Sequence, residues 1–441
     1  MKYLKKSHQK GLQFKGEITV FVSLVFMLVL SLVMALLTSA TLQIEKSKVR
    51  ARMQLALESV FAEYHREILD DYDLFVRADG SESVLEKRLQ YYGIVDVKHQ
   101  ILKSKLLTDD GGLPYYQGAV RYMKDWIGLS GSVGTEGNVF EVDDKLEKLE
   151  RENQSELSAL LSQDEQTLLE DDNPLNNITN LKKSNLLSLL ISDQETISQK
   201  TIETESLPSK RTLKKGIGVF ENEEGEGGAL EKVLFAEYLT HHFSYYSKTK
   251  DDTKLSYELE YLLGGKESDK ENLEEVLKKI LWIRTGINYV YLQTDEVRKA
   301  EAGAMATGLC VLMTVPGITE VVKQALLLGW AYGESIVDLK VLMRNEKVPA
   351  MKTSETWQLK LSNLSKLGTK EEVTGEKHFS KGLDYKDYLR GLLLLEKRES
   401  LCMRSLDLIE SNTSVKVDEC MTRVVLLSDF KGKFQTEFSY R

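Results

Sequence analysis

Glu334 and Asp338 are the two carboxylates whose spacing best suits acid and base chemistry. They stand four residues apart, directly after the apolar patch at residues 330–333, so a helix would place both on one face. Burial of such a pair can split the two pKa values, leaving one group as an acid and the other as a base. A helix face lined with acids and balanced by Lys340 or Arg344 is the simpler interpretation. We therefore favour a structural role for this pair over catalysis.

The sequence indicates neither a metal site nor a nucleotide site. His241 and His242 are adjacent, and neighbours on a helix point about 100° apart, whereas residues four apart can share one ion. The dipeptide Gly265-Lys266 lacks the earlier glycine of a phosphate-binding loop, and Glu267 follows it in place of Ser or Thr. The stretch at residues 216–218 lacks the third glycine of a dinucleotide fingerprint. We expect no cofactor, and we expect the histidines to lie at the surface or to be partly packed.

Three cysteines are too few for disulfides to define the fold. Cys310 lies in an apolar run, as expected for a small core residue. Cys402 and Cys420 are a candidate disulfide if the domain is exported, because thiols pair in oxidising compartments. The sequence leaves this pairing open and favours free thiols.

A long apolar stretch dominates the amino-terminal part of the chain. Residues 18–42 contain no charge, Gly or Pro, and about 20 apolar residues cover the roughly 30 Å hydrocarbon core of a bilayer. We therefore expect residues 17–42 to be a transmembrane anchor in a lipid bilayer. A signal peptide cut near Thr38-Ser39-Ala40 is the alternative, but its apolar part is usually about 7–15 residues. Apolar residues continue at helical spacing to Tyr72, which predicts one helix over residues 17–72 and favours a retained anchor.

Residues 1–16 form a basic leader. Gly16 followed by Glu17 is similar to a prepilin processing site, in which a basic leader ends in Gly before a long apolar helix. Cleavage would make Glu17 the first mature residue, whereas the usual pilin pattern has Glu at the fifth. In the alternative, Lys15 anchors at the headgroups and Glu17 interacts with the helix dipole. Lysines flank the anchor on both sides, but a remainder of roughly 400 residues can be translocated largely regardless of charge. We therefore expect a cytoplasmic leader and an extracytoplasmic head.

Length and composition bound the rest of the chain. With 441 residues, 42% of them hydrophobic, it can form one large or two small domains. The formal net charge of −9 argues against a nucleic-acid partner, since phosphate binding requires clustered Lys and Arg. We expect residues 43–129 to complete the amphipathic helix and begin the head, and residues 229–441 to form most of it. Residues 130–228 have the composition of a polar, poorly packed insertion, in which residues 142–169 and 181–191 contain enough Leu for amphipathic helices.

The pattern of apolar residues predicts an α+β head, in which a small antiparallel sheet packs on several helices. Ser268 and Glu271 have the spacing of a capping box at the start of one helix, and Pro316-Gly317 divides another apolar region into two helices. The expected strands cover residues 93–107, 255–263, 422–427 and 434–440. The expected helices cover residues 114–126, 229–246, 268–290, 302–343 in two parts, and 383–410.

Several runs of the sequence resemble an uncharacterised Gram-positive bacterial family. They are Lys-Gly-Glu-Ile-Thr-Val-Phe from Lys15, YELEYLLGGKESDKENL from Tyr257, WAYGESIVDLKVLM from Trp330, VPAMKTSETW from Val348, LDYKDYLRGLLLL from Leu383 and LDLIE from Leu406. Members of that family are single-anchor membrane proteins of unknown function, met near tight-adherence (Flp) pilus assembly genes and similar to minor pseudopilins. The resemblance carries no known catalytic residue.

The resemblance implies a pilus-associated envelope role. The leading hypothesis is a non-enzymatic, membrane-anchored component of a tight-adherence pilus or type II secretion-like machine, with pilus or secretion assembly proteins as partners. A membrane-tethered binding or sensor module is the alternative, in which aromatic residues such as Phe243, Tyr245 and Tyr246 would supply a ligand surface. An anchored hydrolase is disfavoured, because no nucleophile and base stand at interpretable spacing.

Overall fold

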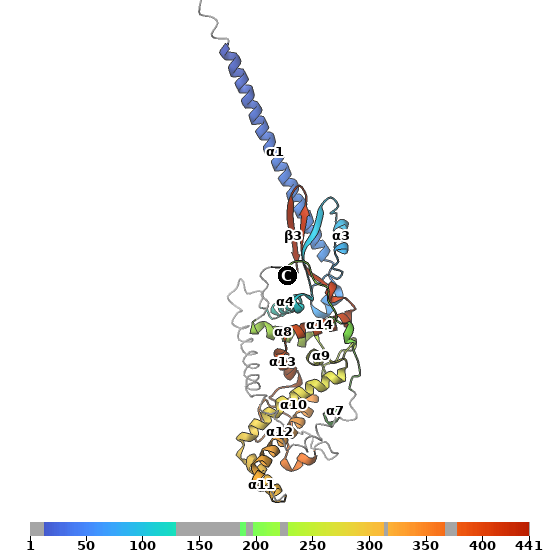
Figure 1. Ribbon diagram of the computed structural model, residues 1–441, viewed down its shortest axis with the longest axis vertical. Coiled ribbons are helices and arrows are strands. Elements are labelled where there is room, and N and C mark those ends of the chain that lie inside the picture. The colour runs from blue at the N-terminus through green and yellow to red at the C-terminus, as the bar shows by residue number, and fades with distance from the viewer. Residues whose placement is uncertain are drawn as a thin grey trace, which may run out of the picture.

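The computed structural model of this chain describes residues 13–128, 186–190, 197–220, 228–312, 316–366 and 377–440. It confirms the α+β class, since helices make up most of the described chain and one three-stranded antiparallel sheet packs beside them. The molecule is elongated. Helix α1 (Gln13–Phe61) projects from one end, beside the sheet, while α11 (Glu296–Leu312) and α12 (Thr319–Met343) lie toward the other (Figure 1).

Helix α1 has two halves with different surroundings. The large apolar side chains between Ile18 and Leu37 are exposed, which makes α1 a candidate single membrane span. From Val49 onward one face of the helix is buried against the head. The helix ends at Phe61, earlier than the expected Tyr72, because His65 turns the chain: its N–H donates to Val76 O at 2.8 Å and its ring accepts from the N–H of Ile68. A separate helix, α2 (Arg66–Tyr72), follows.

The sheet holds the two ends of the described chain together. Strands β1 (Lys98–Leu106), β2 (Met421–Asp429) and β3 (Lys433–Ser439) pair antiparallel in the order β1-β2-β3. These strands confirm the strand expected within residues 93–107 and the carboxy-terminal hairpin. The sheet, the second half of α1 and α3 (Glu82–Tyr91) enclose a hydrophobic cluster of their own, in which Met53, Leu57 and Phe61 are fully buried.

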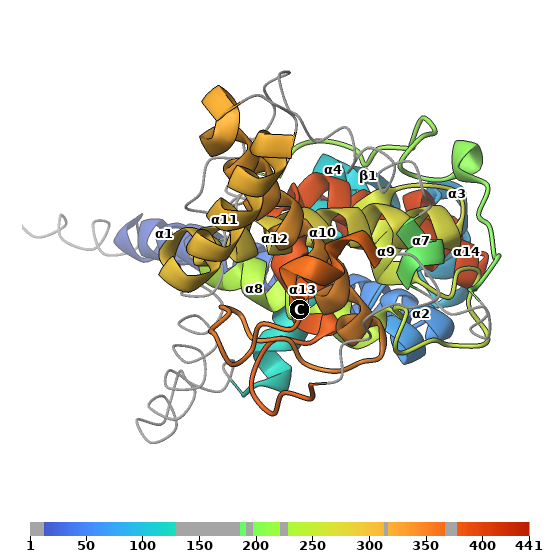
Figure 2. The ribbon, with the colours of Figure 1, turned by 90° about the horizontal axis from the view of Figure 1, so that it is seen from below.

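The remaining helices form the larger part of the head around a second hydrophobic cluster. Figure 2, which looks along the molecule from the far end, shows α10, α11 and α12 grouped together. The α-helices are α4 (Asp109–Trp126), α7 (Leu186–Leu190), α8 (Ala229–His242), α9 (Glu258–Gly264), α10 (Asp269–Thr294), α13 (Tyr385–Leu395) and α14 (Arg398–Thr413). The 3-10 helices are η3 (Thr204–Ser206), η4 (Pro316–Ile318), η5 (Leu361–Lys366) and η6 (Val417–Glu419).

Several local signals are confirmed. The hydroxyl of Ser268 accepts from the N–H of Glu271 at 3.3 Å and caps α10. The apolar region around Pro316-Gly317 is divided there into α11 and α12, as expected. The helix expected over residues 114–126 is present as most of α4, in which residues 110–112, near its start, have left-handed backbone. Gly112 is required there, because its φ is +79° and a Cβ atom would lie 2.8 Å from Cβ of Cys402.

Three further expected elements are wrong, each because tertiary contacts override a local pattern. Residues 255–263 were expected to be a strand but contain helix α9. The expected helix over residues 383–410 is two helices, since Glu396 and Lys397 have extended backbone and Lys279 binds the Glu396 carboxylate at 3.0 Å. Helix α8 ends at His242, before the expected residue 246.

Part of the expected polar insertion is packed. Leu186, Leu187 and Leu190 of α7 are buried in the larger cluster, so a short helix does form within residues 181–191. Residues 197–220 run along the head, where Arg211 pairs with Glu410 at 2.5 Å and Asp418 at 2.6 Å. Of the expected insertion over residues 130–228, these segments therefore belong to the folded head. The helix expected at residues 142–169 lies outside the described residues.

Candidate functional site: a buried ion-pair network

The predicted pair Glu334 and Asp338 lies in the middle of α12, in the interior of the head. Both side chains are fully buried. Their counter-ions come from other segments: Arg284 from α10, and Lys352 from the loop that follows α12. The expectation that Lys340 or Arg344 balances the acids is therefore wrong, since both cations come from outside α12.

Asp338 is held by both cations. Arg284 donates to Asp338 Oδ2 from NH2 at 2.7 Å and from Nε at 3.0 Å. Lys352 Nζ lies 2.6 Å from Oδ1. Asn288 Nδ2 donates to Oδ2 at 3.0 Å and also to the hydroxyl of Ser335. Asp338 therefore joins α10, α12 and the following loop at a single carboxylate.

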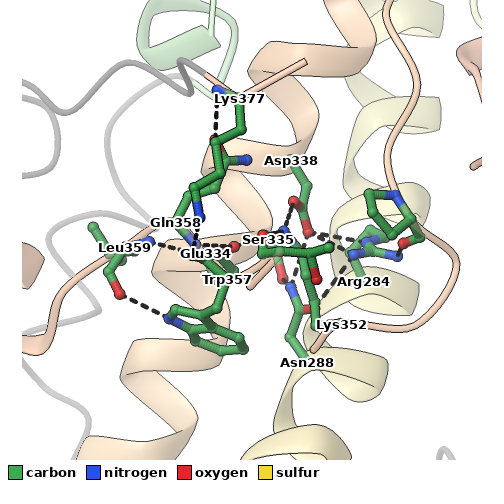
Figure 3. Close-up of polar contacts among 12 residues, drawn as sticks. Arg284, Asn288, Glu334, Ser335, Asp338, Lys352, Trp357, Gln358, Leu359 and Lys377 are labelled. Carbon is green, nitrogen blue, oxygen red and sulfur yellow. Dashed lines mark hydrogen bonds and ion pairs between the residues drawn. The ribbon is translucent and has the colours of Figure 1, made fainter. Parts of the chain in front are cut away.

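The side chain of Glu334 binds backbone N–H groups of the loop that follows α12. Its carboxylate accepts from Lys352 Nζ at 2.6 Å, from the N–H of Gln358 at 3.0 Å and from the N–H of Leu359 at 2.7 Å. The carbonyl of Leu359 in turn accepts from the indole N–H of Trp357 (Figure 3). It also accepts from the indole N–H of Trp330 on α12, at 2.8 Å. Residues 352–359 are thus bound to α12 through the Glu334 carboxylate and the Trp330 indole, while the Trp357 indole makes its hydrogen bond within the loop itself.

Arg284 holds the start of the same loop. We call the four charged residues Arg284, Glu334, Asp338 and Lys352 the clamp. Its NH1 group donates to the carbonyls of Pro349 at 2.9 Å and Ala350 at 3.0 Å. A fully buried guanidinium with bonds to a carboxylate and two carbonyls has the satisfied donors that burial of a charge demands. The formal charges of these four side chains sum to zero, so the network itself carries no net charge.

The pKa values of Glu334 and Asp338 are shifted apart, as in a catalytic acid–base pair. Unlike the groups of such a pair, the two carboxylates are not exposed to solvent. Burial raises the pKa of Glu334, although Lys352 opposes this. For Asp338, burial acts in the same direction, but Arg284 and Lys352 outweigh it and hold the pKa below its usual value. Such a split can serve catalysis. Here all four charged side chains are 0% exposed within the part of the chain that the structure describes, so neither carboxylate meets solvent. The arrangement acts chemically as a clamp.

The amino-acid sequence does not predict the two cations as partners of the acids, for different reasons. Arg284 continues the core-facing spacing of Val276, Leu277 and Ile280, so a lone charge on an apolar helix face was a usable signal for a buried ion pair. Lys352 lies in an irregular loop whose local sequence indicates nothing about burial.

A second set of buried carboxylates lies on α9 and stabilises the turn after α8. Glu258 accepts from the N–H and hydroxyl of Ser244, both at 2.8 Å. Glu260 Oε1 accepts from the N–H of Tyr246 at 2.9 Å and from the hydroxyl of Tyr385 at 2.8 Å. The strand predicted for this segment would have put Glu258 and Glu260 on its polar face, so their burial was not foreseen. The N–H groups of Ser244 and Tyr246 thus donate to these carboxylates and not to carbonyls of a continuing α8. The helix therefore ends at His242.

Glu260 gives a pH-dependent prediction. Burial raises its pKa to about 7, despite the hydrogen bonds from Tyr246 and Tyr385. As pH rises from about 4.5 to about 7, the unfolded chain releases this proton and the folded chain keeps it, so this group lowers stability by about 3 kcal/mol across that window. Glu260→Gln keeps an oxygen acceptor and does not titrate. Relative to this variant, we expect wild type to lose about that free energy of unfolding between the two pH values.

Chemical denaturation of both proteins at several pH values measures this difference directly. Tyr385→Phe serves as the matched variant, because losing the hydroxyl that favours the carboxylate should move the window to higher pH. A difference between wild type and Glu260→Gln that does not change with pH would contradict the assignment.

The remaining candidate residues lie in separate places. Gly16 and Glu17 lie near the start of α1, and the ion-pair network lies on other elements, α10, α12 and the loop after α12. Cys402 and Cys420 are buried free thiols, so the candidate disulfide is not formed, and burial raises the pKa of Cys420 to about 12. Cys310 is buried, in agreement with its expected core position. None of the three is placed for thiol chemistry.

The histidine pair and its aromatic neighbours are also structural. His242 is buried with Nδ1 3.1 Å from Asp71 O, and burial lowers its pKa to about 4, while His241 is exposed. Phe243 and Tyr245 are buried and Tyr246 is half-buried, so the expectation that they supply a ligand surface is wrong. Within the described ranges, no group of three or more His, Cys, Asp or Glu side chains is placed to hold a metal ion.

Comparison with known proteins gives one match. No curated protein and no solved structure matches the chain. Residues 164–432, which include α7 to α14, the clamp and all of β2, match a family of unknown function, DUF5702. Because this match covers more than half of the sequence, the chain belongs to the DUF5702 family of unknown function.

Proposed function

We propose that this protein is a non-enzymatic, membrane-anchored envelope protein, and specifically a minor pilin-like or assembly component of a tight-adherence (Flp) pilus or type II secretion-like machine. Its head lies outside the cytoplasm, and its partners are the lipid bilayer and the assembly proteins of that machine. The proposal builds on the resemblance of its sequence runs to the single-anchor family met near such pilus genes.

One observation carries the proposal: a single continuous helix serves both as the apolar span and as part of the head. The side chains of Phe21, Met27 and Leu36 are 62–72% exposed, because no other part of the described chain packs against them. A bilayer would cover these apolar side chains. Further along the same helix, Met53 and Leu57 are fully buried against the sheet. Pilin-like subunits use this layout, because the apolar half rests in the bilayer before assembly and packs against neighbouring helices in a filament.

The head supports a binding or scaffolding role over an enzymatic one. Its interior charges are paired at the clamp, where they fix a loop onto two helices. The acids on α9 are occupied by backbone N–H groups and hydroxyls. Groups engaged in this way stabilise a rigid head, as a structural subunit requires.

Side-specific labelling tests the topology. In cells of the native host, a membrane-impermeant maleimide should label Val297→Cys, which replaces an exposed side chain on α11. Ser7→Cys, in the leader, should be labelled only after lysis. The native cysteines are buried and give a low background. Labelling of Ser7→Cys but not of Val297→Cys in intact cells would place the head in the cytoplasm and end the pilin-like proposal.

Mass spectrometry of the amino terminus separates the two roles within the proposal. Because Glu17 would be the first mature residue and not the fifth, we expect the intact Met1 terminus, typical of a permanent assembly platform. A terminus at Glu17 that requires the prepilin peptidase would instead identify a processed subunit, able to leave the bilayer for a filament. The control is the same measurement in a strain that lacks the prepilin peptidase, in which a peptidase-dependent terminus at Glu17 should be absent.

A further inference from the structure

The turn of the β2–β3 hairpin lies beside α1 close to the point where its apolar stretch ends. Lys431 Nζ, in the turn, pairs with Glu45 of α1 at 2.5 Å. A Cβ atom on Gly432 would lie 3.2 Å from Lys46 Nζ, so the two segments approach closely. Lys46 follows Leu42 by about 6 Å along the helix. The polar headgroup layer of a bilayer is roughly 5–8 Å deep on each side, so the hairpin turn falls at its depth.

The charges at this edge of the head are mainly positive. We define the basic rim as residues 45–52 of α1, residues 96–98 at the start of β1 and residues 429–433 of the hairpin. These segments contain seven Lys or Arg residues and three Asp or Glu residues, whereas the whole chain has a formal net charge of −9. The cations are Lys46, Lys48, Arg50, Arg52, Lys98, Lys431 and Lys433.

Strand pairing assembles the rim from distant parts of the sequence. Lys98 is the pairing partner of Asp429, and Asp429 is the partner of Lys433, so all three strands present their ends at the same edge. Apolar side chains lie among the charges: Val95, just before the rim, is 75% exposed, and the ring of Phe430 lies 5.5 Å below Lys431 Nζ. Cations mixed with an exposed apolar side chain and a half-buried aromatic ring suit the interface of a bilayer.

We propose that the basic rim is a membrane-contact surface that binds anionic lipid headgroups of the bilayer in which α1 is anchored. The rim holds the sheet end of the head against the bilayer, and the long axis of the head then stands away from it, as the line of α1 suggests (Figure 1). This inference rests on the proposed membrane anchoring, but it is independent of the pilus assignment and of which side the head occupies.

The test places one fluorophore near the rim and one far from it. The full chain is reconstituted into phosphatidylcholine vesicles with or without phosphatidylglycerol, carrying a quencher on the lipid headgroup. The label is attached to Gln435→Cys, on the exposed face of β3 near the hairpin turn, or to Val297→Cys at the far end. We expect several-fold more quenching at residue 435 than at residue 297. Phosphatidylglycerol should increase it, and salt raised from about 0.1 M to about 1 M should reverse that increase.

Neutralising the hairpin tests the cations themselves. Lys431→Gln with Lys433→Gln should reduce quenching at residue 435 in phosphatidylglycerol vesicles to the level in phosphatidylcholine alone. The matched control, Lys232→Gln with Lys347→Gln, removes the same charge from exposed sites outside the rim and should change nothing.

Each other outcome has one meaning. Equal quenching at residues 435 and 297, in vesicles that carry the protein through a flotation gradient, overturns the rim and leaves the anchor standing. Quenching at residue 435 that changes neither with phosphatidylglycerol nor with the lysine substitutions also contradicts headgroup binding by the basic rim. The helix alone would then position the hairpin. Protein that fails to float with the vesicles overturns the anchor and the rim together.

Discussion

Asp338→Asn should lower the free energy of unfolding by about 3–5 kcal/mol, the usual cost of leaving a buried charge without its partner. The substitution preserves the shape of the side chain but removes the charge that both Arg284 and Lys352 face at 2.6–2.7 Å. Arg284 would then lose the carboxylate with which it pairs, while Lys352 would keep Glu334. Chemical denaturation of the full chain in detergent, followed by tryptophan fluorescence, measures the loss, since Trp330 and Trp357 are buried beside the clamp.

Asp70→Asn is the matched control, because it removes the same kind of charge from an exposed pair. Asp70 lies 3.3 Å from Arg66, and the two side chains are 59% and 87% exposed. Solvent screens such a pair, so the expected change is below about 1 kcal/mol. Similar small losses for the two variants would show that water reaches the clamp, and would reopen Glu334 and Asp338 as a chemical site.

The clamp illustrates how far sequence reasoning reaches. The spacing of Glu334 and Asp338 correctly placed both acids on one helical face. Their partners come from 50 or more residues earlier and from a loop after the helix, and no local pattern connects those positions. Periodicity reports which face of an element is buried, but the identity of the opposing group is decided by how elements pack.

Element types were predictable where the segment was long enough to show its period. Helix α1 and helix α12 each extend over many turns, so their class was clear from the sequence. Helix α9 has only seven residues, too few to distinguish a helix from the alternation of a strand. It forms as a helix because Glu258 and Glu260 bind backbone N–H groups of residues 244 and 246, a contact across 14 residues.

The joint between anchor and head gives the second large expected effect. Leu57 of α1 is 0% exposed within the hydrophobic cluster formed with α3 and the sheet. Leu57→Asp would lose the buried leucine, worth about 2–5 kcal/mol, and would add an unpaired buried carboxylate at a further cost. We expect this cluster to open, so that limited proteolysis cuts between α1 and the sheet, while the larger cluster around Trp330 stays folded.

Leu55→Asp isolates this effect, since Leu55 lies two residues away on the same helix and is 65% exposed. It stands about 20 Å beyond Leu42, where the expected span ends, so a charge there should leave both the fold and the membrane anchoring unchanged. If Leu57→Asp were as protease-resistant as Leu55→Asp, the second half of α1 would not be packed on the sheet. The anchor would then be a flexible tether, and neither a pilin-like subunit nor a head held against the bilayer could be built on it.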